Sequence, residues 1–426
     1  MLSNGENIVK EKYKIIFRSY YAPILYDYVS WVIEDARKRN IKKLYFLSRD
    51  GYLMYLVAER ILSYRKIEDI SISYLKVSRY SLRSAQYYLL GEKSLDYICI
   101  NGIDVTLRKI LIRAGLSKEQ QEAVVETISI IKLEDIDRVL SRSEIKKVKR
   151  ILSGNTIFWE YLNNNSKTAY ENTLGYLRQE GVDNNEEIAI VDSGWVGSIQ
   201  ESIKQLLKIN SLQGYYFGLY EIPRGVEEKN YHSYYFGPKA TRGLMHDNYA
   251  DNQRKVHFSN CLFEAIYSSP EGMCLGYKKE DNRYISIDGR ENPNKLYMNA
   301  AYEVMKEYAE DELGVKGDID INEDVIVEAM AYPSLEDVNV LEKLQFCDDV
   351  IEYEYQSIVR PWAIKDVKKN TVIYRIFNKL FNPKYVENTS GWPEGSIVRC
   401  GYKVDYYLKQ ERLYKKLMYI RKAIKR

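Results

Sequence analysis

The chain has 426 residues, with 63 Lys or Arg against 60 Asp or Glu, and five scattered cysteines. Its length predicts two domains, or one domain with an inserted lobe, because single cores rarely grow to this size. Because positive and negative charges nearly balance, the chain has no overall positive field that would attract nucleic acid, and no nucleic-acid partner is expected. The cysteines have no metal-ligand spacing and fit a reducing compartment. No signal peptide and no run of about 18 apolar residues is visible, which predicts a cytoplasmic protein.

The first ninety residues show helix and strand patterns in alternation. Residues 12–39 have helix spacing, with Asn40 as the expected stop, and Lys43–Leu47 forms a short apolar run typical of a buried strand. The segment 48–51 predicts a turn, and 52–62 an apolar helix. Residues 70–77 alternate as a second strand, which predicts a βαβ unit with a right-handed crossover. Residues 1–90 are therefore assigned to N-terminal helices and the first half of an α/β core.

Residues 91–184 have no pattern typical of a buried strand. Segments 105–114, 118–131 and 143–152 predict short amphipathic helices, and 156–179 predicts one or two longer ones. This region is interpreted as a helical insertion between strands of the core.

The region 185–222 is assigned to the second half of the core. Residues 188–191 predict a buried strand that ends at Asp192, and helix spacing starts at Ser198, so Gly194 and Gly197 bracket a turn between them. The free N–H groups and positive dipole of such a helix start suit a phosphate. The alternative is an ordinary turn with glycines for tight packing, since the pattern is neither a Walker loop nor a dinucleotide turn. A further strand is expected at 212–220.

Residues 223–406 are assigned to a mostly α-helical C-terminal domain. Turns are expected up to about residue 255, and helices at 259–267, 296–312 and 337–359. Residues 407–426 predict a basic amphipathic tail with Leu413, Leu417, Ile420 and Ile424 on one side. Such a helix suits the surface of an anionic membrane, and the alternative is a terminal helix that docks on its own domain.

The two strand–turn–helix units, at 43–62 and 188–207, are interpreted together as parts of one ligand site. Ligands of open parallel sheets bind at the carboxyl ends of the strands. If the two strands are neighbours, Arg49 with the backbone near Gly51 can hold one anion, and the turn before Ser198 can hold another. A sugar with a phosphate at one end and a pyrophosphate at the other, such as phosphoribosyl pyrophosphate, matches this layout.

Both units resemble the plan of type I phosphoribosyltransferases. Residues 44–52 resemble the turn that holds pyrophosphate in that family, and 188–198 the turn that holds the ribose 5-phosphate. With 77–79 and 263–272, they also resemble a bacterial family found beside haloacid-dehalogenase (HAD)-type phosphatases in surface-polysaccharide gene clusters, whose members are often labelled as such hydrolases. The resemblance covers most of residues 20–280 and implies an α/β fold with a parallel-sheet, phosphoribosyltransferase-like core.

The sequence departs from these families in two places. Phosphoribosyltransferases usually carry two adjacent acids, whereas Asp192 is followed by Ser193, and Trp195 to Ser198 replace the usual Thr-Gly-Gly-Thr. Direct binding of a metal ion by this motif is therefore not expected. The phosphatase chemistry needs an Asp-x-Asp pair after a buried strand, and the nearest string, Asp318-Ile-Asp320, lies in a polar stretch.

The resemblance implies a glycosyltransferase that moves a 5-phosphoribofuranosyl group to a hydroxyl of a glycan or lipid-linked glycan in capsule or O-antigen synthesis. Mg²⁺ bound through the donor pyrophosphate and a separate phosphatase that removes the 5-phosphate are expected as cofactor and partner. The candidate general bases are Asp50, Glu264 and Glu271. The candidate donor-binding residues are Ser48, Arg49, Gly51, Arg79, Arg83, Asp192, Ser193, Gly194, Trp195, Val196, Gly197 and Ser198. The alternatives are a phosphosugar-binding partner of another glycosyltransferase without activity of its own, and a HAD-type phosphatase.

Overall fold

The computed structural model describes residues 4–128, 132–183, 187–238, 248–314, 325–347, 351 and 355–424. Its centre is a five-stranded sheet in the order β2-β1-β3-β4-β5, and every neighbouring pair is parallel. The strands are β1 (Lys43–Leu47), β2 (Ser71–Leu75), β3 (Ile188–Trp195), β4 (Gln213–Leu219) and β5 (Tyr231–Phe236). The predicted α/β class and the parallel sheet are therefore confirmed.

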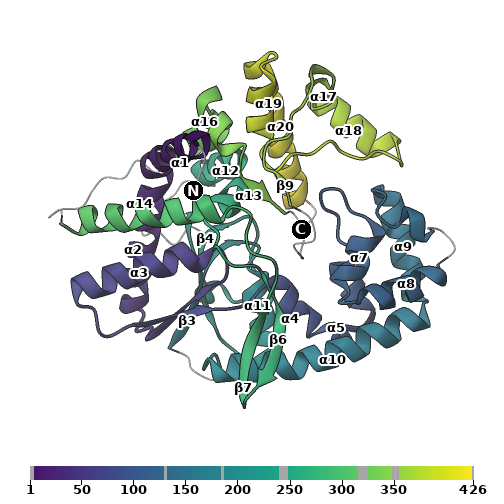
Figure 1. Cartoon of the computed structure of the whole chain (residues 1–426), viewed down its shortest axis with the longest axis horizontal. Coiled ribbons are helices and arrows are strands. Elements are labelled where there is room, and N and C mark those ends of the chain that lie inside the picture. The colour runs from purple at the N-terminus through teal and green to yellow at the C-terminus, as the bar shows by residue number, and fades with distance from the viewer. Residues whose placement is uncertain are drawn as a thin grey trace.

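Helices cover both faces of the sheet (Figure 1). Side chains of β1 alternate between the faces, because successive residues of a strand point to opposite sides. Leu44 and Phe46 join a core with the N-terminal helices and helices from the C-terminal half, whereas Tyr45 and Leu47 join a second core with the helices at 79–84, 156–179 and 198–207. The apolar strands noted in the sequence are thus buried on both faces, as parallel strands usually are.

The N-terminal helices lie on the first face. They are α1 (Asn4–Ile16) and α2 (Ala22–Lys38), joined by a π-helical turn at Phe17–Tyr21, and α3 (Gly51–Arg65). Asn40 has a positive φ of 60° just after the helix end, in agreement with the stop predicted there. On the second face lie α4 (Arg79–Ser84), α10 (Thr156–Gln179) and α11 (Ser198–Leu207).

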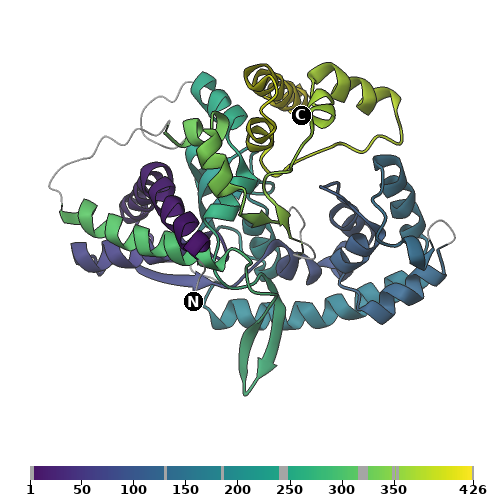
Figure 2. The same cartoon turned by 45° about the horizontal axis from the view of Figure 1, so that its top comes forward.

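The inserted lobe is helical and has a hydrophobic core of its own, built from residues 87–162. Its helices are α5 (Tyr87–Leu90), α6 (Leu95–Ile98), α7 (Leu107–Arg113), α8 (Lys118–Glu126) and α9 (Arg142–Ser153), and α10 leads back to the sheet. The lobe lies beside the sheet, on the side away from α2 and α3 (Figures 1 and 2). All regular secondary structure in the described residues between β2 and β3 is helical, as their sequence pattern predicts.

The C-terminal half contains more strand than predicted. The expected turns after residue 223 are wrong over β5, which pairs with β4 and extends the core to residue 236. The antiparallel hairpin of β6 (Cys274–Glu280) and β7 (Arg283–Asp288) was also missed. The expected helix at 337–359 is wrong beyond α16 (Leu335–Leu341), because β8 (Gln345–Phe346) and β9 (Gln356–Ser357) pair there.

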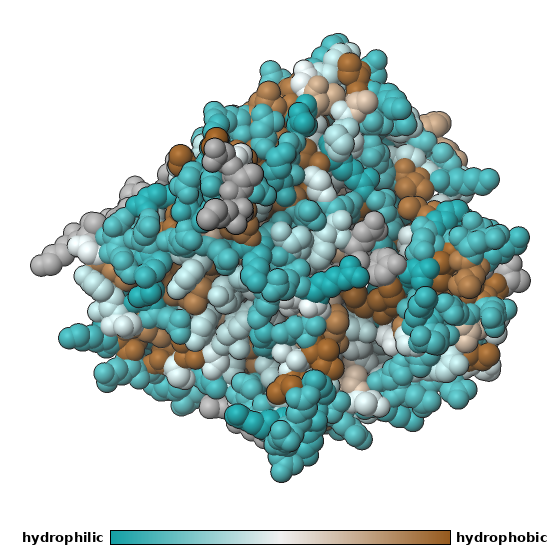
Figure 3. All heavy atoms as spheres, viewed as in Figure 1, coloured by the Kyte–Doolittle hydropathy of each residue, from teal (hydrophilic) through white to brown (hydrophobic). Residues whose placement is uncertain are grey.

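The remaining helices pack around the first face and the top of the molecule as drawn in Figure 1. They are α12 (Asn248–His257), α13 (Asn260–Ile266), α14 (Lys295–Gly314), α15 (Val325–Ala331), α17 (Ile364–Lys368), α18 (Val372–Phe381), α19 (Pro393–Cys400) and α20 (Val404–Ile424). The face of the molecule in Figure 3 is mostly hydrophilic. In the described part of the chain, no helix is both long and apolar enough to cross a membrane.

The tail helix α20 docks on its own domain. Tyr407, Leu408 and Tyr414 are buried, and the buried acid Glu411 pairs with Arg375 at 2.5 Å. Leu413 and Ile420, two of the apolar residues expected to face a membrane, are nearly half exposed and lie on another side of the helix from these contacts. Helix α20 therefore docks on its own domain, and contact of its exposed side with a membrane stays a prediction.

Candidate functional site

The two strand–turn–helix units meet at one pocket. β1 pairs with β3, so the two strands are neighbours, which is the condition under which their turns were expected to form one site. In the strand order 2-1-3-4-5, the topological switch point lies between β1 and β3, where ligands of open α/β sheets bind. The pocket is lined by Ser48, Arg49, Asp50, Val77, Ser78, Arg79, Asp192, Ser193, Gly194, Trp195, Val196, Ser198, Ile199, Glu264, Met273 and Cys347.

The turn after β1 forms one wall of the pocket. The Ser48 hydroxyl donates to the carbonyl oxygen of Val77 at 2.7 Å and accepts from the Val77 N–H at 3.0 Å. These bonds tie the end of β1 to the end of β2, and the Ser48–Arg49 peptide bond is cis. The adjacent Arg49 guanidinium donates to the Tyr355 hydroxyl at 3.4 Å. The turn thus holds a cation at the carboxyl end of the strand.

β3 is longer than predicted, so Asp192 lies inside the strand and not in the following turn. Pairing with β4 continues through Trp195, which lies opposite Leu219, whereas pairing with β1 stops at Val191. Residues 192–195 therefore pair with β4 as part of the strand. The sequence did not indicate this, because Ser193 and Gly194 are residue types that favour turns. The β1 side of the same residues is left open toward the pocket, and this opening creates the crevice.

Gly194 and Gly197 allow the backbone to make this transition. Gly194 has φ +108°, and a Cβ there would lie 2.4 Å from the carbonyl oxygen of Gly218 on β4. Gly197 has φ +61° and is the N-cap of α11, which no side chain caps. The N–H groups of the first turn of α11, from Ser198 onward, therefore have no side-chain cap, as an anion site requires, whereas the Val196 N–H donates to the Gly194 carbonyl oxygen at 3.1 Å.

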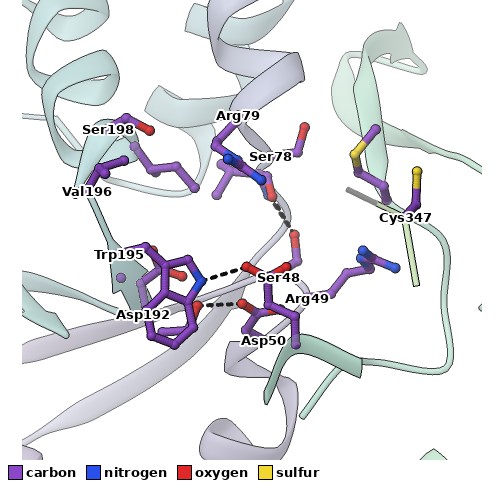
Figure 4. Close-up of a pocket in the computed structure, with 16 residues that line it drawn as sticks. Ser48, Arg49, Asp50, Ser78, Arg79, Asp192, Trp195, Val196, Ser198 and Cys347 are labelled. Carbon is purple, nitrogen blue, oxygen red and sulfur yellow. Dashed lines mark hydrogen bonds between the residues drawn. The ribbon is translucent and has the colours of Figure 1, made fainter. Parts of the chain in front are cut away.

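Three acids lie around the base of the pocket. The Ser193 hydroxyl donates to Asp50 at 2.5 Å, and the Trp195 indole N–H donates to Glu264 at 2.6 Å (Figure 4). Burial, with the charges of Glu264 and Asp192, raises the pKa of Asp50 to about 8. Burial also raises the pKa of Asp192 to about 7, and backbone hydrogen bonds and Arg79 oppose that shift. Perturbed acids that gather in a cleft are typical of functional sites.

The arginines divide between the pocket and the lobe. Arg79 is the first residue of α4 and lines the pocket opposite Asp50 in the view of Figure 4. Its position is fixed by the N-cap Ser78, whose hydroxyl accepts from the Ser81 N–H at 2.9 Å. Arg83 does not line the pocket and instead packs over the Tyr97 ring, 4.3 Å from its centroid.

Several predicted site residues lie outside the pocket lining. Glu271 forms an ion pair with Lys76, which also contacts Asp288 at 2.9 Å. Gly51 is the first residue of α3 and packs on Phe46 of β1. Gly197 packs closely against Pro223, which a Cβ at this position would meet. Of the three candidate bases, the structure therefore brings Asp50 and Glu264 into the pocket, and leaves Glu271 in an ion pair.

Sequence reasoning missed part of the pocket wall. Val77 and Ser78 follow β2, so the rule that ligands bind at strand ends could have found them. Ile199 lies one residue beyond the predicted turn. Met273 and Cys347 come from the C-terminal half, and no local pattern in the sequence connects them to β1 or β3.

No group of three or more His, Cys, Asp or Glu side chains within the described residues could hold a metal ion. Mg²⁺ typically takes only one or two carboxylates and completes its shell with water and substrate phosphates. Asp50 and Asp192 line the pocket and are the two aspartates that could take that role, for which each must be deprotonated. The Asp318-Ile-Asp320 string lies outside the described residues.

No protein-family model matches this chain, and no curated protein matches it. The fold and the pocket define an α/β protein with a polar site at the switch point of a parallel sheet.

Proposed function

We propose that this chain is a phosphoribosyltransferase-like glycosyltransferase. It transfers a 5-phosphoribofuranosyl group from phosphoribosyl pyrophosphate to a glycan hydroxyl in surface-polysaccharide synthesis. One observation carries the proposal: the turn after β1 and the helix start after β3 line a single pocket, with buried acids between them. That spacing suits a ligand with an anion at each end and hydroxyls in the middle.

The donor has a defined orientation in this proposal. Its 5-phosphate binds the backbone N–H groups of the first turn of α11, which begins at Ser198. Its pyrophosphate binds the turn of Ser48 and Arg49, and Arg79 on α4 closes over it from another side of the pocket. Asp192 accepts hydrogen bonds from the ribose hydroxyls between the two anions.

The reaction breaks the bond from ribose C1 to the pyrophosphate oxygen, and the pyrophosphate leaves with the electron pair. The acceptor hydroxyl oxygen forms the new bond to C1, and its proton passes to a carboxylate. Arg49 and Arg79 stabilise the charge that develops on the leaving group. Mg²⁺ bound to the pyrophosphate would add to this stabilisation.

Asp50 is the general base in this proposal. Its pKa of about 8 lies near the working pH, which is the range in which a general base is most effective. Glu264 is held by the Trp195 indole and contributes by raising the pKa of Asp50. Glu271 is already engaged with Lys76.

The test is to incubate the chain with Mg²⁺, phosphoribosyl pyrophosphate and candidate glycan acceptors, including lipid-linked ones, and to follow pyrophosphate release. Release that depends on the acceptor supports the transferase. Saturable donor binding without turnover across the acceptors would instead indicate a non-catalytic phosphosugar-binding partner. Phosphate release from a generic phosphoester would indicate a phosphatase. A product that keeps its 5-phosphate would also support the need for a separate phosphatase.

A further inference from the structure

Helix α18 has its charged side chains inside and its apolar side chains outside. Helices of globular proteins normally turn their apolar stripe to the core. Here the exposed side chains are Ile373, Tyr374, Phe377, Leu380 and Phe381, with exposed fractions from 37% to 82%. We call these five residues the α18 face. An apolar face of this kind marks an interaction site.

The polar side of α18 is locked against the rest of the chain. Arg375 is buried and pairs with Glu387 at 2.8 Å and with Glu411 of α20 at 2.5 Å. One turn later, Lys379 pairs with Glu387 at 2.5 Å. Rolling α18 to hide its apolar face would leave these buried charges unpaired, which is strongly unfavourable. The face is therefore held outward by its ion pairs.

The surroundings of the α18 face are basic. Residues 364–386 contain six Lys or Arg and one acid. Two of the six, Arg375 and Lys379, are neutralised on the inner side by Glu387 and Glu411, and the other four remain. Lys365, Lys368 and Lys369 precede the helix, Lys384 follows it, and all four are exposed. Helices α17 and α18 lie together at the outer edge of the molecule, away from the sheet (Figures 1 and 2). Apolar side chains beside lysines complement a bilayer surface that carries anionic head groups.

We propose that α18 docks the protein on an anionic membrane surface, with the α18 face inserted at the head-group boundary and the flanking lysines against acidic lipids. A helix of 10 residues buries limited apolar area, so both contributions are needed, and binding weakens with salt. The α18 face points away from the ion pair that joins α18 to α20 and lies outside the pocket, and the proposal does not depend on the proposed reaction.

The test is flotation of the full chain with vesicles of phosphatidylcholine alone and of phosphatidylcholine with 30% phosphatidylglycerol, at low and high salt. We expect binding to the anionic vesicles only, with roughly tenfold or greater loss in F377S/F381S because two large apolar side chains no longer enter the bilayer. The matched control is I8S/I15S, which removes two equally exposed side chains of α1 and is expected to bind normally. The charge variant K365Q/K368Q/K369Q is expected to bind several-fold more weakly at low salt.

A second measurement keeps the proposal testable if the serine variant folds poorly. In F377W, a blue shift of tryptophan emission on addition of anionic vesicles, larger than in the parent chain, reports insertion of this position. Absence of vesicle binding by the parent chain overturns the proposal, and so does binding that F377S/F381S leaves unchanged. Dimerisation that F377S/F381S abolishes, without vesicle binding, would assign the face to a second copy of the chain instead.

Discussion

The Ser193 hydroxyl donates a 2.5 Å hydrogen bond to Asp50 across 143 residues of sequence. It joins the open side of β3 to the turn after β1. The bond partly offsets the burial and the repulsion from Glu264 and Asp192 that raise the pKa of Asp50. The two halves of the proposed donor site are therefore coupled chemically as well as in space.

Replacing Asp192 by Asn is expected to lower transfer by about 10² or more and to leave the fold intact. The reason is that a positioned contact made in the transition state is worth a few kcal/mol. Steady-state kinetics and the circular dichroism spectrum check this. Near-normal turnover by the variant would contradict the role given to Asp192.

The contributions of the three arginines to donor binding can be distinguished by single substitutions. Arg49→Ala and Arg79→Ala are each expected to weaken donor binding by roughly 10-fold or more, because each loses a charge-assisted hydrogen bond to phosphate. Arg83→Ala is the control, since its side chain packs over Tyr97 outside the pocket. Calorimetric titration with phosphoribosyl pyrophosphate measures the three affinities, and an equal loss in Arg83→Ala would show that the assignment is wrong.

Asp50 is expected to make the fold less stable as pH rises. Its pKa is about 8 in the folded chain against 3.8 as the ordinary value, so the unfolded chain loses this proton first. The stability that protonated Asp50 provides is complete below about pH 4 and is lost as pH rises through 8. Asp50→Asn removes this term, so its apparent Tm should exceed that of the parent by a few °C at pH 9, but not at pH 4. Differential scanning fluorimetry at both pH values checks the prediction, and a constant difference would refute it.

Gly194→Ala is expected to destabilise the chain by about 1–3 kcal/mol, because the new Cβ meets the Gly218 carbonyl and φ is positive. Gly225→Ala is the matched control. Its φ is also positive, at +63°, but nothing lies within 4 Å of the new Cβ, so only the conformational cost remains. Chemical denaturation compares the two, and equal losses would argue against the close approach.

Lys415 is expected to be essential for docking of the tail helix. It pairs at 2.5 Å with Glu394, whose side chain is 1% exposed, so Lys415→Met leaves a buried charge without its partner, at a cost of roughly 3–5 kcal/mol. Lys416→Met, at an exposed position next to it, should change stability little. Thermal unfolding of the two variants compares their stabilities. Because the Lys415–Glu394 ion pair lies beyond Tyr407, deletion of the chain after that residue is expected to destabilise the domain in the same way.

The sequence by itself determined the local elements near the site. The apolar run at β1 and the helix start at Ser198 have strong short-range patterns, and both lie where predicted. Asp50, Asp192 and Arg49 were found because polar residues directly after apolar strands are visible in the sequence. These features depend on neighbours a few residues away, so local patterns suffice to predict them.

Only the tertiary structure decided how these elements combine. β3 continues through Trp195 because β4 pairs with it, and β5 was missed because its tyrosine-rich segment, which follows a run of turn residues, becomes a buried strand through contact with β4. Glu271 forms an ion pair with Lys76 and does not join Asp50 and Glu264 in the pocket. The apolar face of α18 points outward because Arg375 on its other side pairs with Glu387 and Glu411. Strand order and side-chain pairing join residues far apart in sequence, and no local pattern encodes which distant partner each one meets.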